Sequence, residues 1–201
     1  MEVPLEVTND PYYLELILSK NRIVLNSQNA NQSNGDLRLA FEETYKYLNF
    51  SQMKASNVLI LGFGIGSIVK DLQSHFGTIE IDAIENNNQI VEWFYKYYPL
   101  DNIKIHHQSA ADLNTINCKA FDVVIVDLFI DHHIPEFVYE TSFFETLNSL
   151  LSDNGILIWN TLPANQSKIS LKLKELFDEP FETQFGNLMY LKRKKMDTEF
   201  F

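Results

Sequence analysis

Three glycines that follow a short apolar run are the first residues in this sequence whose types and spacing could do chemistry. Gly62, Gly64 and Gly66 come directly after the four apolar residues Val58 to Leu61. Such a run is typical of a strand buried on both faces of a parallel sheet. Glycines allow a tight turn in which the backbone passes close to a ligand. A helical pattern follows, and this order predicts a nucleotide-like cofactor site; the alternative is a structural turn without a ligand.

Carboxylates close two other apolar segments. Glu85 lies 85 − 62 = 23 positions after the first glycine, close to the spacing of about 20 at which an acid binds a ribose diol. Asp127 ends the run 121–126, which is apolar apart from Asp122. Desolvation there could raise the pKa of Asp127 toward that of a general base, or the group could stay ionised and hold a cationic amine. A solvated strand end is the alternative for both residues.

Polar residues after the third expected strand could border an adenine ring. Ser109 and Ala110 follow this strand, and Asp112 could accept a hydrogen bond from the adenine amino group. Asp112 could equally be a first-turn helix residue that the helix dipole stabilises.

Several other chemistries are disfavoured. His132 and His133 follow Asp131, but neighbouring residues in a turn point apart and no third ligand has a recognisable spacing, so we expect no metal. The sequence has neither a phosphate-binding P-loop nor a nucleophile elbow. The position of Gly66 does not fit the dinucleotide pattern Gly-x-Gly-x-x-Gly, which favours a mononucleoside binder over a nicotinamide dehydrogenase.

The amino-acid composition limits the kinds of molecule that this protein is expected to bind. The 201 residues include 16 Lys and Arg against 27 Asp and Glu, a net charge of −11 that repels nucleic acid. This charge suits a cationic small substrate, although acidic surfaces also serve solubility alone. Cys118 is the single cysteine, so no disulfide framework is expected. We see no signal peptide and no run long enough for a membrane helix, and we expect a cytoplasmic protein without a membrane partner.

Strands and helices alternate from residue 57 onward, which predicts an α/β sheet covered on both faces. Ligands bind such sheets beyond the carboxyl ends of the strands. We expect a turn at 153–155 and an antiparallel pair formed by the last two strands. The expected strands are 57–61, 78–84, 103–107, 121–126, 156–159, 181–185 and 187–193, and the expected helices are 65–76, 87–98, 138–152 and 166–177.

The N-terminal segment stands outside this alternation. Residues 14–18 and 23–25 read as a hairpin. The polar tract 26–35 is either a flexible linker or a loop folded over the cofactor site. Asp36 could cap a helix whose apolar face carries Leu37, Phe41, Tyr45 and Leu48. We therefore divide the chain into a hairpin with its polar loop, residues 1–35, and a cofactor-binding domain, residues 36–201.

These motifs together resemble a known family. The run 58–67, Glu85 after the second strand and the run 121–127 are similar to the class I S-adenosylmethionine-dependent methyltransferase fold. General methyltransferases usually carry an acid two residues before the first glycine. This chain has Ile60 at that position and in this respect is similar to spermidine synthases. The segment from Asp127 to Phe144 also resembles the Asp-x-Phe…Pro…Thr-x-x-Phe pattern of spermidine synthase-like proteins. The likeness covers about residues 12–160.

The resemblance implies a Rossmann-like, mostly parallel seven-stranded sheet with an antiparallel last strand and a small N-terminal β-hairpin. It implies S-adenosylmethionine or its decarboxylated form as cofactor. It also implies a small-molecule acceptor substrate, which could be cationic. A homodimer is one of the assemblies left open. Asp127 and Asp131 are the expected catalytic residues. The expected cofactor-binding residues are Gly62, Phe63, Gly64, Gly66, Glu85, Asn86, Ser109, Ala110 and Asp127.

Several residues of this chain differ from the pattern of the aminopropyltransferases, and these differences determine which function we expect first. Ile65 and Ser109 stand where those enzymes have acids, and Asp131 is offset by one position from their second acid. The tyrosine-containing triplet that they carry before the glycine strand is absent. We therefore expect a methyltransferase-like enzyme acting on an unidentified small acceptor. The alternatives are aminopropyl transfer to a polyamine and a non-catalytic binding protein that retains the fold.

Overall fold

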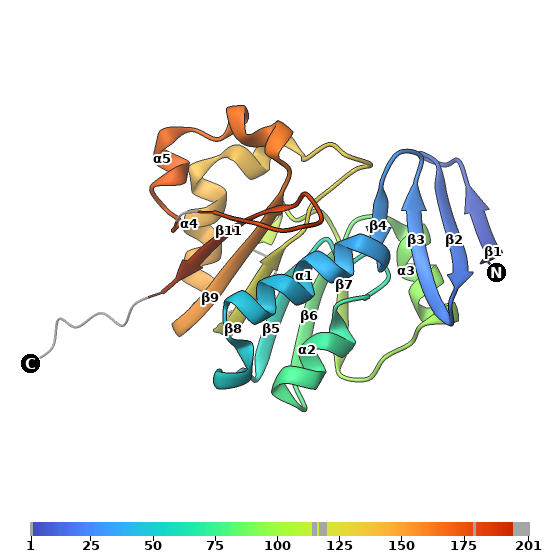
Figure 1. Cartoon of the computed structure of the whole chain (residues 1–201), viewed down its shortest axis with the longest axis horizontal. Helices are drawn as coiled ribbons and strands as arrows, with labels where there is room; N and C mark the ends of the chain where they lie inside the picture. The colour runs from blue at the N-terminus through green and yellow to red at the C-terminus, as the bar shows by residue number, and fades with distance from the viewer. Residues whose placement is uncertain (1, 114–115, 117–119, 179, 195–201) are drawn as a thin grey trace, which may run out of the picture.

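The computed structural model describes residues 2–113, 116, 120–178 and 180–194, so Cys118 lies outside the described residues. Its centre is a seven-stranded sheet in the order β10-β11-β9-β8-β5-β6-β7 (Figure 1). The five strands β5 to β9 run parallel, and β10 and β11 are antiparallel to their neighbours. The predicted fold class is therefore confirmed. The strands are β5 (Asn57–Leu61), β6 (Glu80–Glu85), β7 (Ile103–His107), β8 (Phe121–Val126), β9 (Leu151–Thr161), β10 (Phe181–Glu182) and β11 (Leu188–Arg193).

Helices cover both faces of this sheet. The residues of β5 alternate between two apolar cores: Val58 and Ile60 face one, and Leu59 and Leu61 face the other. Helices that flank the first core are α1 (Gly35–Tyr47), α2 (Val69–Phe76) and α3 (Asn88–Tyr97). The second core is covered by α4 (Thr141–Leu150) and α5 (Leu171–Lys174). Burial on both faces explains why β5 is a continuous apolar run.

The N-terminal segment forms a second sheet beside the first one (Figure 1). The predicted hairpin is confirmed as β2 (Leu14–Ser19) and β3 (Arg22–Ser27), joined at Lys20 and Asn21, which both have positive φ. The prediction was incomplete, because β1 (Glu2–Thr8) and β4 (Asn31–Ser33) extend the hairpin to four antiparallel strands. The polar tract is thus part strand, and the domain boundary at residue 35 stays a prediction.

Several element boundaries differ from the predicted ones. Helix α2 begins only at Val69, because the glycine turn occupies the preceding residues. The predicted turn at 153–155 is wrong: β9 runs through it, and a register shift against β8 with a positive φ at Asn154 absorbs the polar residues. The predicted helix 166–177 is also wrong in extent, since a 3-10 helix, Pro163–Lys168, precedes the short α5.

The predicted cap of α1 is wrong as well. The helix begins at Gly35, so Asp36 lies within the first turn and Asn34 takes the capping position. The predicted apolar face is confirmed, since Phe41, Tyr45 and Leu48 are buried and Leu37 packs against the first core while partly exposed. Within the described ranges, every helix is too short or too polar to span a bilayer.

Candidate functional site

The glycine turn is shaped by contacts within the protein. Gly62, Gly64 and Gly66 have φ values of 83°, 56° and 73°, a region that side chains disfavour. A Cβ atom on Gly62 would lie 2.1 Å from the backbone oxygen of Asp127, and one on Gly66 would lie 2.7 Å from the ring of Phe63. The absence of side chains therefore lets the turn pack against the end of β8 and against its own aromatic ring.

Glu85 closes β6 beside this turn and is 8% exposed. Its Oε2 accepts a hydrogen bond from the backbone N–H of Gly64 at 3.0 Å, and its Oε1 accepts one from the N–H of Asn87 at 2.9 Å. Burial raises the pKa of Glu85 more than these backbone hydrogen bonds lower it. Because each carboxylate oxygen has two lone pairs, both could accept a further hydrogen bond from ligand hydroxyls.

A pocket with about 660 Å³ of empty space opens at the carboxyl ends of β5, β6 and β8, and we call it the donor pocket. Of the predicted cofactor residues, it brings together Gly62, Gly64, Glu85, Asn86, Ser109, Ala110 and Asp127. Phe63 and Gly66 do not line it: the Phe63 ring is 4% exposed and packs edge-on against Phe94.

The N-terminal sheet supplies lining residues that the sequence analysis missed. Tyr12 and Gln32 both line the donor pocket, and the hydroxyl of Tyr12 accepts a hydrogen bond from Asn87 Nδ2 at 3.2 Å. Ser33, next to Gln32, accepts one from the N–H of Ile65 in the glycine turn at 3.4 Å. Of the two interpretations of the polar tract, the structure therefore agrees with a segment folded over the site. Nothing in the sequence pairs β4 with the glycine turn.

Asp127 lies at the end of β8 in a row of polar side chains on three adjacent strands. Its Oδ1 accepts a hydrogen bond of 2.7 Å from Asn160 Nδ2, and Asn160 Oδ1 accepts one of 3.0 Å from Asn187 Nδ2. Burial raises the pKa of Asp127 to about 7, the Asn160 hydrogen bond opposes this rise, and the charge of Glu85 adds to it. Asn160 lies near the carboxyl end of β9 and directly follows the predicted strand 156–159, so extending the strand-end argument to the fifth predicted strand could have found it.

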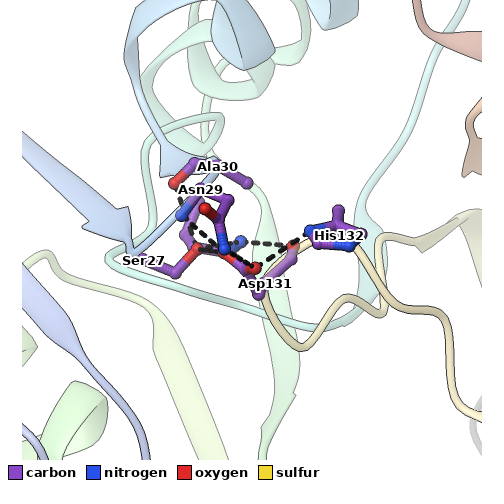
Figure 2. A network of polar contacts seen from close by, with 6 residues as sticks. Ser27, Asn29, Ala30, Asp131 and His132 are labelled. Atoms are coloured by element: carbon purple, nitrogen blue, oxygen red, sulfur yellow. Dashed lines mark hydrogen bonds and ion pairs between the residues drawn. The ribbon is translucent and has the colours of Figure 1, made fainter.

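Asp131 does not lie free beside Asp127. Figure 2 shows its carboxylate inside a cluster formed by the turn between β3 and β4. Ser27 Oγ donates to Oδ1 at 2.5 Å, as does the N–H of Asn29 at 2.9 Å. Asn29 Nδ2 donates to Oδ2 at 2.7 Å, and His132 Nδ1 lies 2.9 Å from the same oxygen. Burial would raise the pKa of Asp131, but these partners lower it to about 2.

Other residues singled out by the sequence have local roles. Ser109 Oγ accepts a hydrogen bond from the N–H of Ala111 at 3.2 Å while the residue lines the donor pocket. Asp112 does not line that pocket. Within the described part of the chain, no group of three or more His, Cys, Asp or Glu residues is placed to hold a metal ion.

The fold and the position of this pocket agree with the comparison to known proteins. The sequence model of the spermine/spermidine synthase domain matches residues 43–179. The chain belongs to this family. The members of this family are transferases, which confirms the prediction of an enzyme. The predicted resemblance to spermidine synthases is also confirmed.

Individual relatives agree with the family assignment. A polyamine aminopropyltransferase of Vibrio vulnificus is 28% identical over 121 residues, which are 56% of this chain and 40% of that protein. The chain thus spans about two fifths of the length of that curated relative. A probable spermidine synthase from Corynebacterium glutamicum superimposes with a TM-score of 0.74 at 14% identity, covering 100% of this chain and 82% of that one.

The broader fold class is also shared. Human methyltransferase-like protein 13, solved in complex with S-adenosylhomocysteine, superimposes with a TM-score of 0.57 at 21% identity, covering 83% of this chain and 82% of that one. At these identities the solved structures show the fold alone. The leading expectation of a methyltransferase is therefore supported only at the level of the fold, and the names of the relatives favour the aminopropyltransferase alternative.

Proposed function

We propose that this protein transfers an aminopropyl group from decarboxylated S-adenosylmethionine to the amine of a small acceptor. The observation that carries the proposal is the charge of the donor pocket. Its described lining includes two carboxylates, Glu85 and Asp127, and neither a lysine nor an arginine. The carboxylate of S-adenosylmethionine would find no cationic partner there, whereas its decarboxylated form presents only positive charges at that end. The names of the curated relatives support the same reaction.

The residues of the donor pocket suit a nucleoside in their chemistry. Glu85 offers two acceptor oxygens, held in place by the backbone of Gly64 and Asn87, for a vicinal diol. Ile90 and Ala110 provide apolar surface for a flat ring, and Ser109 adds a polar edge. Bound there, the donor would supply a sulfonium whose neighbouring carbon an amine nitrogen can attack.

Asp127 is the residue that we assign to the acceptor. With Oδ1 engaged by Asn160, Oδ2 could hold the attacking amine and take up the proton that it loses. A pKa of about 7 lets this carboxylate exist in its basic form near neutral pH. Positioning of the amine against the bound donor would supply most of the remaining acceleration.

We further propose that residues 1–35 act as a cover for a cofactor-binding domain that comprises residues 36–201. Tyr12 and Gln32 support this division, because they reach the donor pocket from the N-terminal sheet. Asp131 belongs to the same arrangement: we propose that it holds the turn between β3 and β4 over the site.

Methyl transfer is the second candidate, and Ile65 is the observation that favours it. The side chain of Ile65 is fully buried in the first core, so this position offers no carboxylate to a cationic donor. The two reactions give different products, which makes them separable in one assay.

Product analysis tests the proposal. The purified chain would be incubated with a mixture of small amines and either decarboxylated S-adenosylmethionine or S-adenosylmethionine, with Asp127→Asn as the control. We expect methylthioadenosine from the decarboxylated donor and none from the Asp127→Asn variant. S-adenosylhomocysteine from the second donor, without methylthioadenosine from the first, would instead support methyl transfer.

A further inference from the structure

A second pocket lies on the other side of Asp127. It has about 410 Å³ of empty space and shares Gln32, Asp127 and Phe129 with the donor pocket. An amine bound in this second pocket would therefore meet the donor across the Asp127 carboxylate. We call it the acceptor pocket.

Neutral amides dominate the polar lining of the acceptor pocket. Four residues with side-chain amides line it beside the exposed His132: Asn31 and Gln32 of β4, Asn160 of β9, and Asn187 directly before β11. The Asn31 side-chain oxygen is buried and has no hydrogen-bond partner among the described residues. Amides both donate and accept hydrogen bonds, so this wall suits an uncharged polar group and gives a second cation no counter-charge.

Asp131, the other carboxylate of the acceptor pocket, already accepts three hydrogen bonds from the protein (Figure 2). Oδ1 accepts from Ser27 Oγ and from the N–H of Asn29, and Oδ2 accepts from Asn29 Nδ2 and lies 2.9 Å from His132 Nδ1. A carboxylate offers about four acceptor positions. Three of them accept hydrogen bonds and His132 lies beside the fourth, so an ammonium group at this carboxylate would compete with these partners.

We propose that the acceptor carries a single amine and ends in an uncharged hydrogen-bonding group, such as a hydroxyl or an amide. The amine would bind Asp127, and the neutral end would bind the amide wall. A diamine would have to bury its second ammonium without a free carboxylate, which is costly. This proposal rests on the proposed function, because that function makes Asp127 the residue that receives the amine.

Calorimetric titration of the intact chain, saturated with methylthioadenosine, tests the proposal with a matched pair of amines. 4-Aminobutan-1-ol and 1,4-diaminobutane differ only in their second end group. We expect the amino alcohol to bind at least as tightly as the diamine. Tighter binding of the diamine by tenfold or more, or no binding of the amino alcohol at millimolar concentration, would overturn the proposal.

A variant provides the second arm of the test. Asn29→Ala removes one hydrogen bond from Asp131 Oδ2 at an exposed position. We expect it to strengthen binding of the diamine severalfold while binding of the amino alcohol stays unchanged. Gln28→Ala, at the neighbouring exposed residue, is the control and should alter neither affinity. Equal responses of both ligands to Asn29→Ala would contradict the role given to Asp131.

The assay of the proposed function separates the two claims. Methylthioadenosine release with diamines but not with amino alcohols would uphold aminopropyl transfer and overturn the single-amine acceptor. Preferred binding of the amino alcohol, without product from any amine, would uphold the acceptor class and overturn the proposed reaction.

Discussion

Asn160 donates a 2.7 Å hydrogen bond from its side-chain amide to Oδ1 of Asp127 across two adjacent parallel strands. The bond fixes the orientation of the carboxylate at the boundary between the donor and acceptor pockets. It also opposes the rise in pKa that burial imposes on Asp127. Asn160 is thus a positioning residue whose effect can be read from a pH profile.

Replacing Asn160 by alanine is expected to move the pH dependence of the reaction. The basic form of Asp127 is the active one, so kcat/KM should rise with pH up to a plateau above its pKa of about 7. Loss of a hydrogen bond to a charged group, worth about 1.5–3 kcal/mol, should shift this rise upward by about one to two pH units. The rate of methylthioadenosine formation between pH 5 and 9 measures it. An unshifted profile in Asn160→Ala would exclude this role, and Asn148→Ala in α4 serves as the control.

Asp127→Asn is expected to stabilise the fold while abolishing activity. The folded pKa of about 7 lies above the usual value of 3.8, so the folded chain binds an extra proton between these values and loses stability as pH rises through them. Each pKa unit corresponds to about 1.4 kcal/mol, which gives a cost of up to about 4 kcal/mol at pH 8. Urea unfolding at pH 4 and pH 8 should show a gain for Asp127→Asn only at the higher pH. The same gain at both pH values would contradict the raised pKa.

Glu85→Gln is expected to weaken binding of the nucleoside part of the donor. The substituted amide nitrogen cannot accept the hydrogen bond that either Gly64 or Asn87 now donates, so the side chain loses both its charge and its fixed orientation. We expect affinity for methylthioadenosine to fall by about ten- to a hundredfold. Glu80→Gln, at the exposed start of β6, is the matched control. Calorimetry that gives equal affinities for Glu85→Gln and Glu80→Gln would rule out a ribose-binding role.

Gly62→Ala is expected to destabilise the chain by more than its backbone conformation alone requires. The added Cβ would lie 2.1 Å from the backbone oxygen of Asp127, so β5 and β8 would have to separate at the site. Gly186→Ala provides the comparison, because it also has a positive φ but open space around it. We expect a loss of about 1–2 kcal/mol for Gly186→Ala and a further loss of about 1–3 kcal/mol for Gly62→Ala. Similar urea midpoints for the two variants would show that the close contact has no effect.

The central sheet and the strand-end acids were predictable from the sequence, since a strand buried on both faces must be continuously apolar. Glu85 and Asp127 stand out because each lies at the carboxyl end of a mostly apolar strand, interrupted by Asp82 in β6 and by Asp122 in β8. Gln32 and Tyr12 could not be found in this way, because they reach the site through packing between the two sheets. Ser27 and Asn29, which donate hydrogen bonds to Asp131, lie 104 and 102 residues away from it in the chain, and no local pattern encodes such contacts.

The choice of donor tests the central claim most directly. Calorimetric titration of the chain with decarboxylated S-adenosylmethionine and with S-adenosylmethionine compares two ligands that differ by one carboxylate. Since the described lining of the donor pocket carries Glu85 and Asp127 but no lysine or arginine, we predict that the decarboxylated donor binds at least about tenfold tighter, which corresponds to about 1.4 kcal/mol. Equal affinities, or tighter binding of S-adenosylmethionine, would contradict the proposed function.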